Sequence, residues 1–241
     1  NHIGPSYNDN HISPSYNDTC INGNIASATA IRNAIFNDQV DAVKDVVPKS
    51  TFPIYKELIN KKIYAGQNDT TLLLAKELLN CNSHPFENYK DCTADLAHKI
   101  MNNLHPFSDY NEFKVRLKSK NYTDARISRV LCHIMLGINN NLYDNVDEKF
   151  YPYIPYIFIL GMTSRGEKLM GQIKSRSTLP YFTSLNDILE YSRGLNDTDS
   201  KVIFENVLHS DIHATKIYNM LLARNSNQPI CDEHSRKFLF V

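Results

Sequence analysis

Apolar residues recur at helical spacing along most of this chain, and clusters of Asn, Pro, Gly and Ser separate the periodic segments. An amphipathic helix places an apolar residue on its buried face every three or four positions, so the pattern predicts helices. These cover residues 28–37, 38–47, 54–62, 69–80, 92–104, 108–119, 124–136, 164–175, 184–191, 199–209 and 211–223. Two short apolar runs, at residues 154–160 and 179–183, are interpreted as buried strands, with a short helix as the alternative for the first. The sequence therefore predicts a mainly α fold with a few short strands.

A proline sets the predicted domain boundary. Pro48 ends the second helix, because its ring clashes with the preceding turn and it has no backbone N–H to donate. We therefore expect two domains, residues 1–48 and residues 49–241. Residues 1–18 consist of two nearly identical nine-residue copies rich in Asn, Pro and Ser. Two copies are too few for a repeat architecture, so this stretch is predicted to be a loop.

Two local signals set helix boundaries in the second half of the chain. Ser164 is followed by Glu167 three positions later, which predicts a capping box that begins a helix. A second boundary is expected at Ser210 or Asp211. His209 and His213, on either side of this boundary, are four residues apart, a spacing that can place two metal ligands on one helix face. Asp211 lies on a different helix face from this pair, and no third ligand follows at a usual spacing, so no metal site is predicted.

The helix that begins after Ser27 carries the first candidate site. Ser27 is a favourable N-cap, and the first turn of a helix presents free backbone N–H groups that attract anions. Thr29 and Arg32 are three residues apart, so a hydroxyl and a guanidinium share one face near this end. The pattern suits a bound phosphate. The alternative is an ordinary capped helix with one surface arginine.

A local basic region is the second candidate site. The helix over residues 124–136 has an apolar face, while cations gather on its other side and on the helix before it. Clustered cations beside an aromatic ring suit an RNA backbone with a stacked base. The alternative is the solvated face of any amphipathic helix. The residues concerned are Lys114, Arg116, Lys118, Lys120, Tyr122, Arg126 and Arg129.

Composition does little to decide between the binding-site interpretations and their alternatives. The 241 residues include 26 basic and 26 acidic side chains, so global charge gives no argument for nucleic-acid binding and any such surface must be local. No apolar run is long enough to span a membrane, and no signal-peptide pattern is present. The five cysteines are scattered, which is typical of reduced thiols. We expect a soluble, cytoplasmic protein without membrane partners.

Four stretches resemble one family in the same order. Residues 25–32 resemble the Ser/Thr-rich, Arg-ended phosphate motif of the nucleotidyltransferase superfamily, in the form seen in the bacterial tRNA(Met) cytidine acetate ligases. Residues 120–134 are similar to the Lys-x-Tyr-Thr-x-x-Arg-x-x-Arg…His-Ile segment of these ligases. Residues 151–180 and 211–218 match their later segments. The resemblance covers nearly the whole chain.

This resemblance implies a fold and a set of binding residues. Residues 1–48 would be the last piece of a Rossmann-like α/β nucleotidyltransferase domain, and residues 49–241 a helical C-terminal domain that binds tRNA. ATP, with Mg²⁺, is the implied nucleotide. The pair His11-Ile12 stands where the family has Arg-Ile, so the bidentate guanidinium is replaced by an imidazole. The implied ATP-binding residues are His11, Ile12, Ser27, Thr29 and Arg32, and the basic region listed above would bind tRNA.

The same resemblance implies a reaction. In the family, ATP and acetate give acetyl-adenylate, and the acetyl group passes to N4 of the wobble cytidine of elongator tRNA(Met). The His-x-Gly-His catalytic motif of the superfamily is absent from this sequence. We therefore expect the chain to be the C-terminal part of a longer enzyme, with no catalytic residue of its own and no activity alone. The alternatives are another nucleotidyltransferase that acts on a small molecule and a non-catalytic RNA-binding domain.

Overall fold

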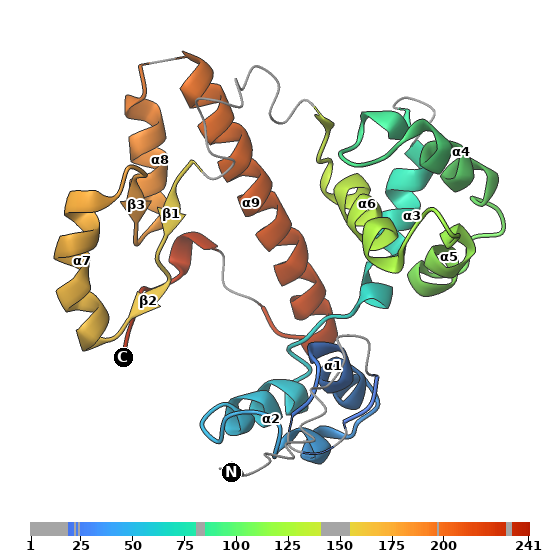
Figure 1. Ribbon diagram of the computed structural model, residues 1–241, viewed down its shortest axis with the longest axis horizontal. Coiled ribbons are helices and arrows are strands. Elements are labelled where there is room, and N and C mark those ends of the chain that lie inside the picture. The colour runs from blue at the N-terminus through green and yellow to red at the C-terminus, as the bar shows by residue number, and fades with distance from the viewer. Residues whose placement is uncertain are drawn as a thin grey trace, which may run out of the picture. The chain divides into compact units, whose positions relative to one another are not determined.

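The computed structural model describes residues 19–21, 23, 25–80, 85–140, 155–196, 198–229 and 233–241. The predicted ATP contacts His11 and Ile12 and the nine-residue repeat lie outside these residues. The chain divides into two compact units, Asn1–Tyr64 and Ala65–Val241 (Figure 1). Each unit is described separately below.

The first unit is built around a short, well-capped helix. Helix α1 (Ala28–Phe36) has the predicted start, and the 3₁₀ turn η1 (Val40–Val43) packs against it. The predicted helix over residues 38–47 is wrong, because Asp38 takes a left-handed conformation (φ 59°) and only η1 follows. Helix α2 (Phe52–Asn60) also packs against η1.

Because α2 packs against η1, the first unit includes residues that follow Pro48. The Phe36 and Tyr64 rings lie 5.6 Å apart between centroids, which adds an aromatic contact within the unit. The first compact unit extends to Tyr64, and the domain boundary at Pro48 stays a prediction. The assignment of residues 1–48 to the end of a Rossmann-like domain stays a prediction.

The second unit begins with a helical core. Its elements are η2 (Gln67–Thr70), α3 (Thr71–Leu79), η4 (Phe86–Asn88), α4 (Ala94–Asn102), α5 (Tyr110–Leu117) and α6 (Asp124–Leu136). Thr123 caps α6 by accepting a hydrogen bond from the Arg126 amide, and Gly137 ends it with φ 67°, both as predicted. The apolar face of α6 is fully buried against α3 and α5 through Ile127, Val130, Leu131 and Ile134.

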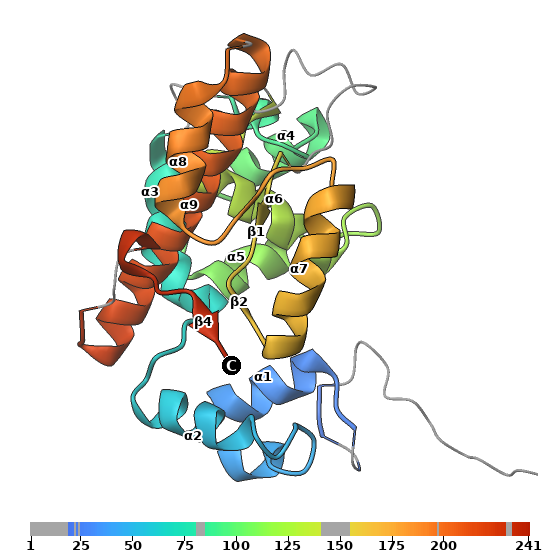
Figure 2. The ribbon, with the colours of Figure 1, turned by 90° about the vertical axis from the view of Figure 1, so that its left-hand side faces the viewer.

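The rest of this unit combines short strands and further helices around a second hydrophobic cluster. Strand β1 (Ile157–Phe158) pairs in parallel with β3 (Tyr181–Phe182), and β2 (Gly161–Met162) pairs in parallel with β4 (Leu239–Phe240). Figure 2 shows β1 and β2 beside α7. The remaining elements are α7 (Ser164–Arg176), α8 (Leu185–Gly194), α9 (Thr198–Ser226) and η6 (Glu233–Ser235).

Two predicted helix boundaries in this region are wrong. Helix α9 runs without a break through residues 210–211, since Asp211 does not cap a new helix but accepts a hydrogen bond from the Tyr156 hydroxyl at 2.8 Å. Helix α7 is capped by Thr163, whose Oγ1 accepts a hydrogen bond from the Gly166 amide at 3.2 Å, so Ser164 is its first residue rather than its cap. The broader prediction of a mainly helical chain with a few short strands is confirmed.

Within the part of the chain that the structure describes, no helix combines the length and apolar character needed to cross a membrane.

The close approach of β2 to β4 depends on a glycine. A Cβ added at Gly161 would lie 2.7 Å from the Leu239 carbonyl oxygen and 2.9 Å from its Cβ. We expect Gly161→Ala to lower the free energy of unfolding by about 1–3 kcal/mol, measured by chemical denaturation, because backbone must move to admit the methyl group.

Gly171→Ala provides the matched control, since nothing lies within 4 Å of a Cβ at this position of α7. It should stabilise the chain by up to about 1 kcal/mol through helix propensity. Equal unfolding free energies for the two variants would contradict the close packing of β2 on β4.

Candidate phosphate site and basic surface

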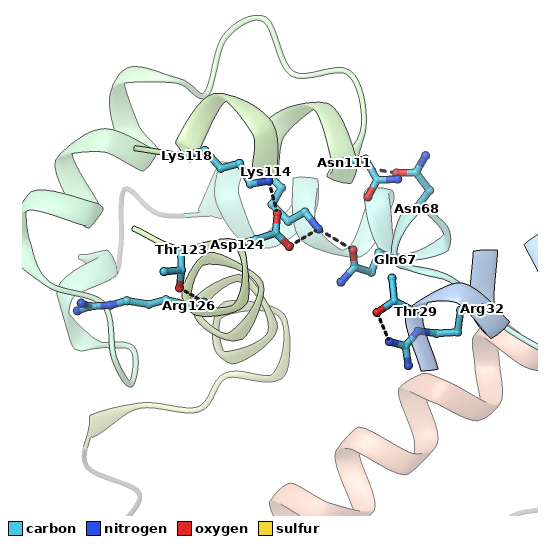
Figure 3. A network of polar contacts seen from close by, with 10 residues as sticks. All are labelled: Thr29, Arg32, Gln67, Asn68, Asn111, Lys114, Lys118, Thr123, Asp124 and Arg126. Atoms are coloured by element: carbon cyan, nitrogen blue, oxygen red, sulfur yellow. Dashed lines mark hydrogen bonds and ion pairs between the residues drawn. The ribbon is translucent and has the colours of Figure 1, made fainter. Parts of the chain in front are cut away.

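The N-terminus of α1 brings together the three predicted phosphate ligands that the structure describes. The Ser27 Oγ accepts a hydrogen bond from the Ala30 amide at 3.0 Å and so fixes the first turn. Arg32 Nη2 donates to Thr29 Oγ1 at 3.4 Å, which places the hydroxyl and the exposed guanidinium side by side (Figure 3). The buried Ala30 faces the interior of the unit, so Arg32 projects to solvent.

This arrangement fits a phosphate group. Helix geometry leaves the amides of Ala28 and Thr29 without an intrahelical acceptor, and the helix dipole adds partial positive charge at the same end. The Arg32 guanidinium contributes a fork of donors that matches phosphate oxygens. One anion could therefore contact main-chain amides, a hydroxyl and a guanidinium of α1.

The basic region is organised around an acidic residue that the sequence prediction did not include. Asp124 binds Lys114 Nζ at 3.1 Å through one carboxylate oxygen and Lys118 Nζ at 2.9 Å through the other (Figure 3). Lys114 Nζ also donates to Gln67 Oε1 at 3.0 Å, and only 13% of its side chain is exposed. Lys114 therefore holds α5, η2 and α6 together, while Lys118 remains at the surface.

Electrostatics at Asp124 follow from these contacts. Burial acts to raise the pKa of its carboxyl, but hydrogen bonds and charge attraction from Lys118 and Lys114 outweigh it and hold the pKa below its usual range. The carboxylate is charged near neutral pH. It cancels part of the positive charge that the sequence places here.

Tyr122 lies beneath Arg126. The Arg126 guanidinium carbon is 5.4 Å from the Tyr122 ring centroid, in cation–π range. The ring is only 9% exposed, and its hydroxyl shares a hydrogen bond of 3.2 Å with Thr93 Oγ1. A stacked base cannot use a ring face that protein atoms cover. In this conformation Tyr122 supports Arg126 instead of offering the base platform expected from the sequence.

The other predicted cations differ in their surroundings. Arg129 Nε donates to Asp91 Oδ2 at 2.6 Å, in a pair that is about half exposed. Arg116 lies over Phe113, with its Nε and Nη2 buried and without a hydrogen-bond partner among the described residues. Lys120 is exposed on the turn before α6. All seven predicted residues thus lie on α5, α6 and the turn between them, but acids paired with three of them reduce the charge.

Sequence reasoning missed Asp91, Asp124 and Gln67 as partners of this surface. Asp124 carried a signal, because it follows the N-cap Thr123 and a carboxylate is favourable in the first turn of a helix. Asp91 carried none, since it reaches Arg129 only through the tertiary fold. Burial raises the pKa of the nearby Cys92 thiol to about 11, so this thiol stays protonated near neutral pH and is not an activated nucleophile.

The family model for HIGH Nucleotidyl Transferase matches residues 10–233, and the chain belongs to this family. Within it, the chain is a distant homologue of the tRNA(Met) cytidine acetate ligases over most of its length.

The matched relatives share low sequence identity with this chain. The tRNA(Met) cytidine acetate ligase of Clostridium novyi (strain NT) is 29% identical over 220 residues, which cover 90% of this chain and 48% of that protein. That of Caldanaerobacter subterraneus subsp. tengcongensis is 27% identical over 203 residues, 83% of this chain and 46% of that protein. This chain therefore spans about half the length of these relatives.

Solved structures show the same fold. The crystal structure of Thermotoga maritima TmcAL in its apo form superimposes with a TM-score of 0.81 at 23% identity, over 94% of this chain and 53% of that one. The structure of that protein bound with alpha-thio ATP gives a TM-score of 0.77 at 22% identity, over 92% of this chain and 53% of that one. The fold of this chain is thus that of TmcAL over the matched half.

The Asp124 ion pairs predict a pH dependence. Since the pKa of this carboxyl is lower in the folded state, the unfolded state binds more protons, and the stabilisation is present above the unfolded-state pKa and lost as the pH falls through the folded-state pKa. Asp124→Asn should therefore destabilise the chain at pH 7, and its urea midpoint should approach that of the unsubstituted chain as the pH falls below the ordinary Asp pKa of about 3.9.

Asp95→Asn is the matched control, because Asp95 is an exposed acid in the first turn of α4 without an ion pair among the described residues. It should shift the midpoint less at neutral pH. A pH-independent loss in Asp124→Asn would show that the two lysine contacts do not stabilise the fold.

Proposed function

We propose that this chain is part of an ATP-dependent ligase that activates acetate as acetyl-adenylate and acetylates N4 of the wobble cytidine of elongator tRNA(Met). The observation that carries the proposal is homology to proteins named tRNA(Met) cytidine acetate ligase over 90% of the chain. Membership of a nucleotidyltransferase family supports the ATP-dependent step. ATP, with Mg²⁺, would supply the adenylate and the leaving pyrophosphate.

For ATP, the proposed contacts are Ser27, Thr29 and Arg32, together with His11 and Ile12. The exposed Arg32 guanidinium beside the Thr29 hydroxyl supports a role in binding phosphate oxygens and in stabilising their charge as pyrophosphate leaves. The fold likeness to a protein whose crystal structure holds alpha-thio ATP is consistent with a nucleotide site in this fold.

For tRNA, the proposed contacts divide by their exposure. Lys118, Lys120, Arg126 and Arg129 have exposed or partly exposed side chains that would meet backbone phosphates. Lys114, Arg116 and Tyr122 are more enclosed and would position the others. Phosphate contacts of this kind orient an RNA without reading its sequence.

The sequence contains no His-x-Gly-His, and this favours a second candidate, a non-catalytic RNA-binding domain. Nucleotide binding discriminates between the two. A ligase part binds ATP at α1, whereas an RNA-binding domain has no need of it.

Arg32→Ala tests the ATP site. Loss of a charge-assisted contact should weaken ATP binding by about tenfold or more, measured by isothermal titration calorimetry on the 241-residue chain. Arg32→Lys should recover part of the affinity, since it keeps the charge but not the fork. Arg193→Ala in the last turn of α8 is the matched control, because it removes another exposed arginine. An unchanged ATP affinity in Arg32→Ala would rule out this site.

Joint substitution of Arg126→Ala and Arg129→Ala tests the tRNA surface. Affinity for elongator tRNA(Met) transcript should fall, and the slope of log affinity against log salt should flatten by about 1.4–1.8 for two lost phosphate contacts. The control is Lys56→Ala with Lys61→Ala, which removes the same charge and two ion pairs at α2 and its C-cap. If both pairs of substitutions reduce binding equally, the effect is one of net charge and the surface is not specific.

A further inference from the structure

Helix α7 presents a row of cations outside the basic region discussed above. Arg165, Lys168 and Arg176 occupy positions i, i+3 and i+11, and Gln172 fills position i+7. On an α-helix these positions lie along one face, within an arc of about 80°. All four side chains are exposed. The row, called the α7 stripe below, is about 16 Å long, because each residue adds roughly 1.5 Å.

The cations of the α7 stripe have no acidic partner within the part of the chain that the structure describes. No ion pair or hydrogen bond among the described residues involves the side chains of Arg165, Lys168 or Arg176. The acid of this helix, Glu167, lies on the other side. In contrast, Lys114, Lys118 and Arg129 of the α5–α6 region each bind a carboxylate.

Packing of α7 does not explain the cations of the α7 stripe. None of its 13 residues is fully buried, and β2 is the element with which it makes most of its contacts. Lys174, which lies away from the α7 stripe, packs over the Tyr181 ring at 5.8 Å. In a chain of zero net charge, three unpaired cations along one helix face are a local concentration suited to an extended polyanion.

We propose that the α7 stripe is a second phosphate-binding surface that contacts the sugar–phosphate backbone of the tRNA. The inference rests on the proposed function, since it takes tRNA as the partner, and it assigns to α7 a role that the sequence motifs did not indicate. The row suits an RNA backbone, which presents charges in succession along a line. The exposed apolar side chains beside it, Leu169 and Ile173, are too few for the broad apolar face of a membrane-surface helix.

The test is joint substitution of Arg165→Ala and Arg176→Ala in the 241-residue chain. Binding of elongator tRNA(Met) transcript should weaken by about three- to thirtyfold near 0.1 M salt, and the salt slope should flatten by about 1.4–1.8. Both side chains are exposed, so the variant should unfold at the same denaturant concentration as the unsubstituted chain. Arg165→Lys with Arg176→Lys should keep the salt slope of the unsubstituted chain and most of its affinity, since a backbone phosphate contact depends mainly on charge while the lost guanidinium fork weakens each contact.

The matched control is Lys216→Ala with Arg224→Ala, which removes two exposed cations from α9. Unchanged tRNA binding in the α7 variant, or an equal loss in the control, would overturn the α7 stripe while leaving the proposed function intact. Absence of tRNA binding by the unsubstituted chain would overturn both. Vesicles containing phosphatidylserine serve as a second probe, and binding to them but not to tRNA would assign the stripe to a membrane surface instead.

Discussion

The packing of α6 against α3 and α5 is the constraint on which the helical core of the second unit depends. Four apolar side chains of α6 are almost completely buried, and each fully buried aliphatic side chain contributes roughly 1.5–3 kcal/mol of hydrophobic stabilisation. Because α6 is amphipathic, fixing this face inward fixes Arg126 and Arg129 outward. The orientation of the basic surface is thus a consequence of core packing.

The same helix shows why charge in a sequence overstates charge on a surface. Asp124 is the first residue of α6, where the helix dipole stabilises a negative charge. From this position its carboxylate binds Lys114 of α5 and Lys118, the residue that follows α5. These pairs tie α5 to α6 but consume cations that could otherwise meet an external anion. A surface can therefore be rich in lysine and arginine and still present modest net charge. Helix α7 shows the opposite case, with fewer cations but, among the described residues, no acid paired with those of the α7 stripe.

Local signals allowed most of the fold to be predicted. The start of α1 at Ser27 and both ends of α6 follow from cap residues, which act through their own neighbouring backbone. The errors arose where tertiary contacts decide. Asp is a common N-cap residue, so Asp211 was predicted to begin a new helix. In the structure its carboxylate accepts a hydrogen bond from Tyr156, which is distant in the sequence, and α9 continues through this position. For the sites, the spacing of Thr29 and Arg32 in the sequence predicted that they lie together. The burial of Tyr122 in the core, where its hydroxyl shares a hydrogen bond with Thr93, depends on tertiary contacts that its neighbours in the sequence do not indicate.

The parallel pairing of β2 with β4 bears on the order of events during synthesis. Helices α3 to α6 make contacts that are local in sequence, so this core can form once the ribosome has released residue 136. Strand β2 must wait until β4 emerges, roughly eighty residues later, before its backbone gains this partner.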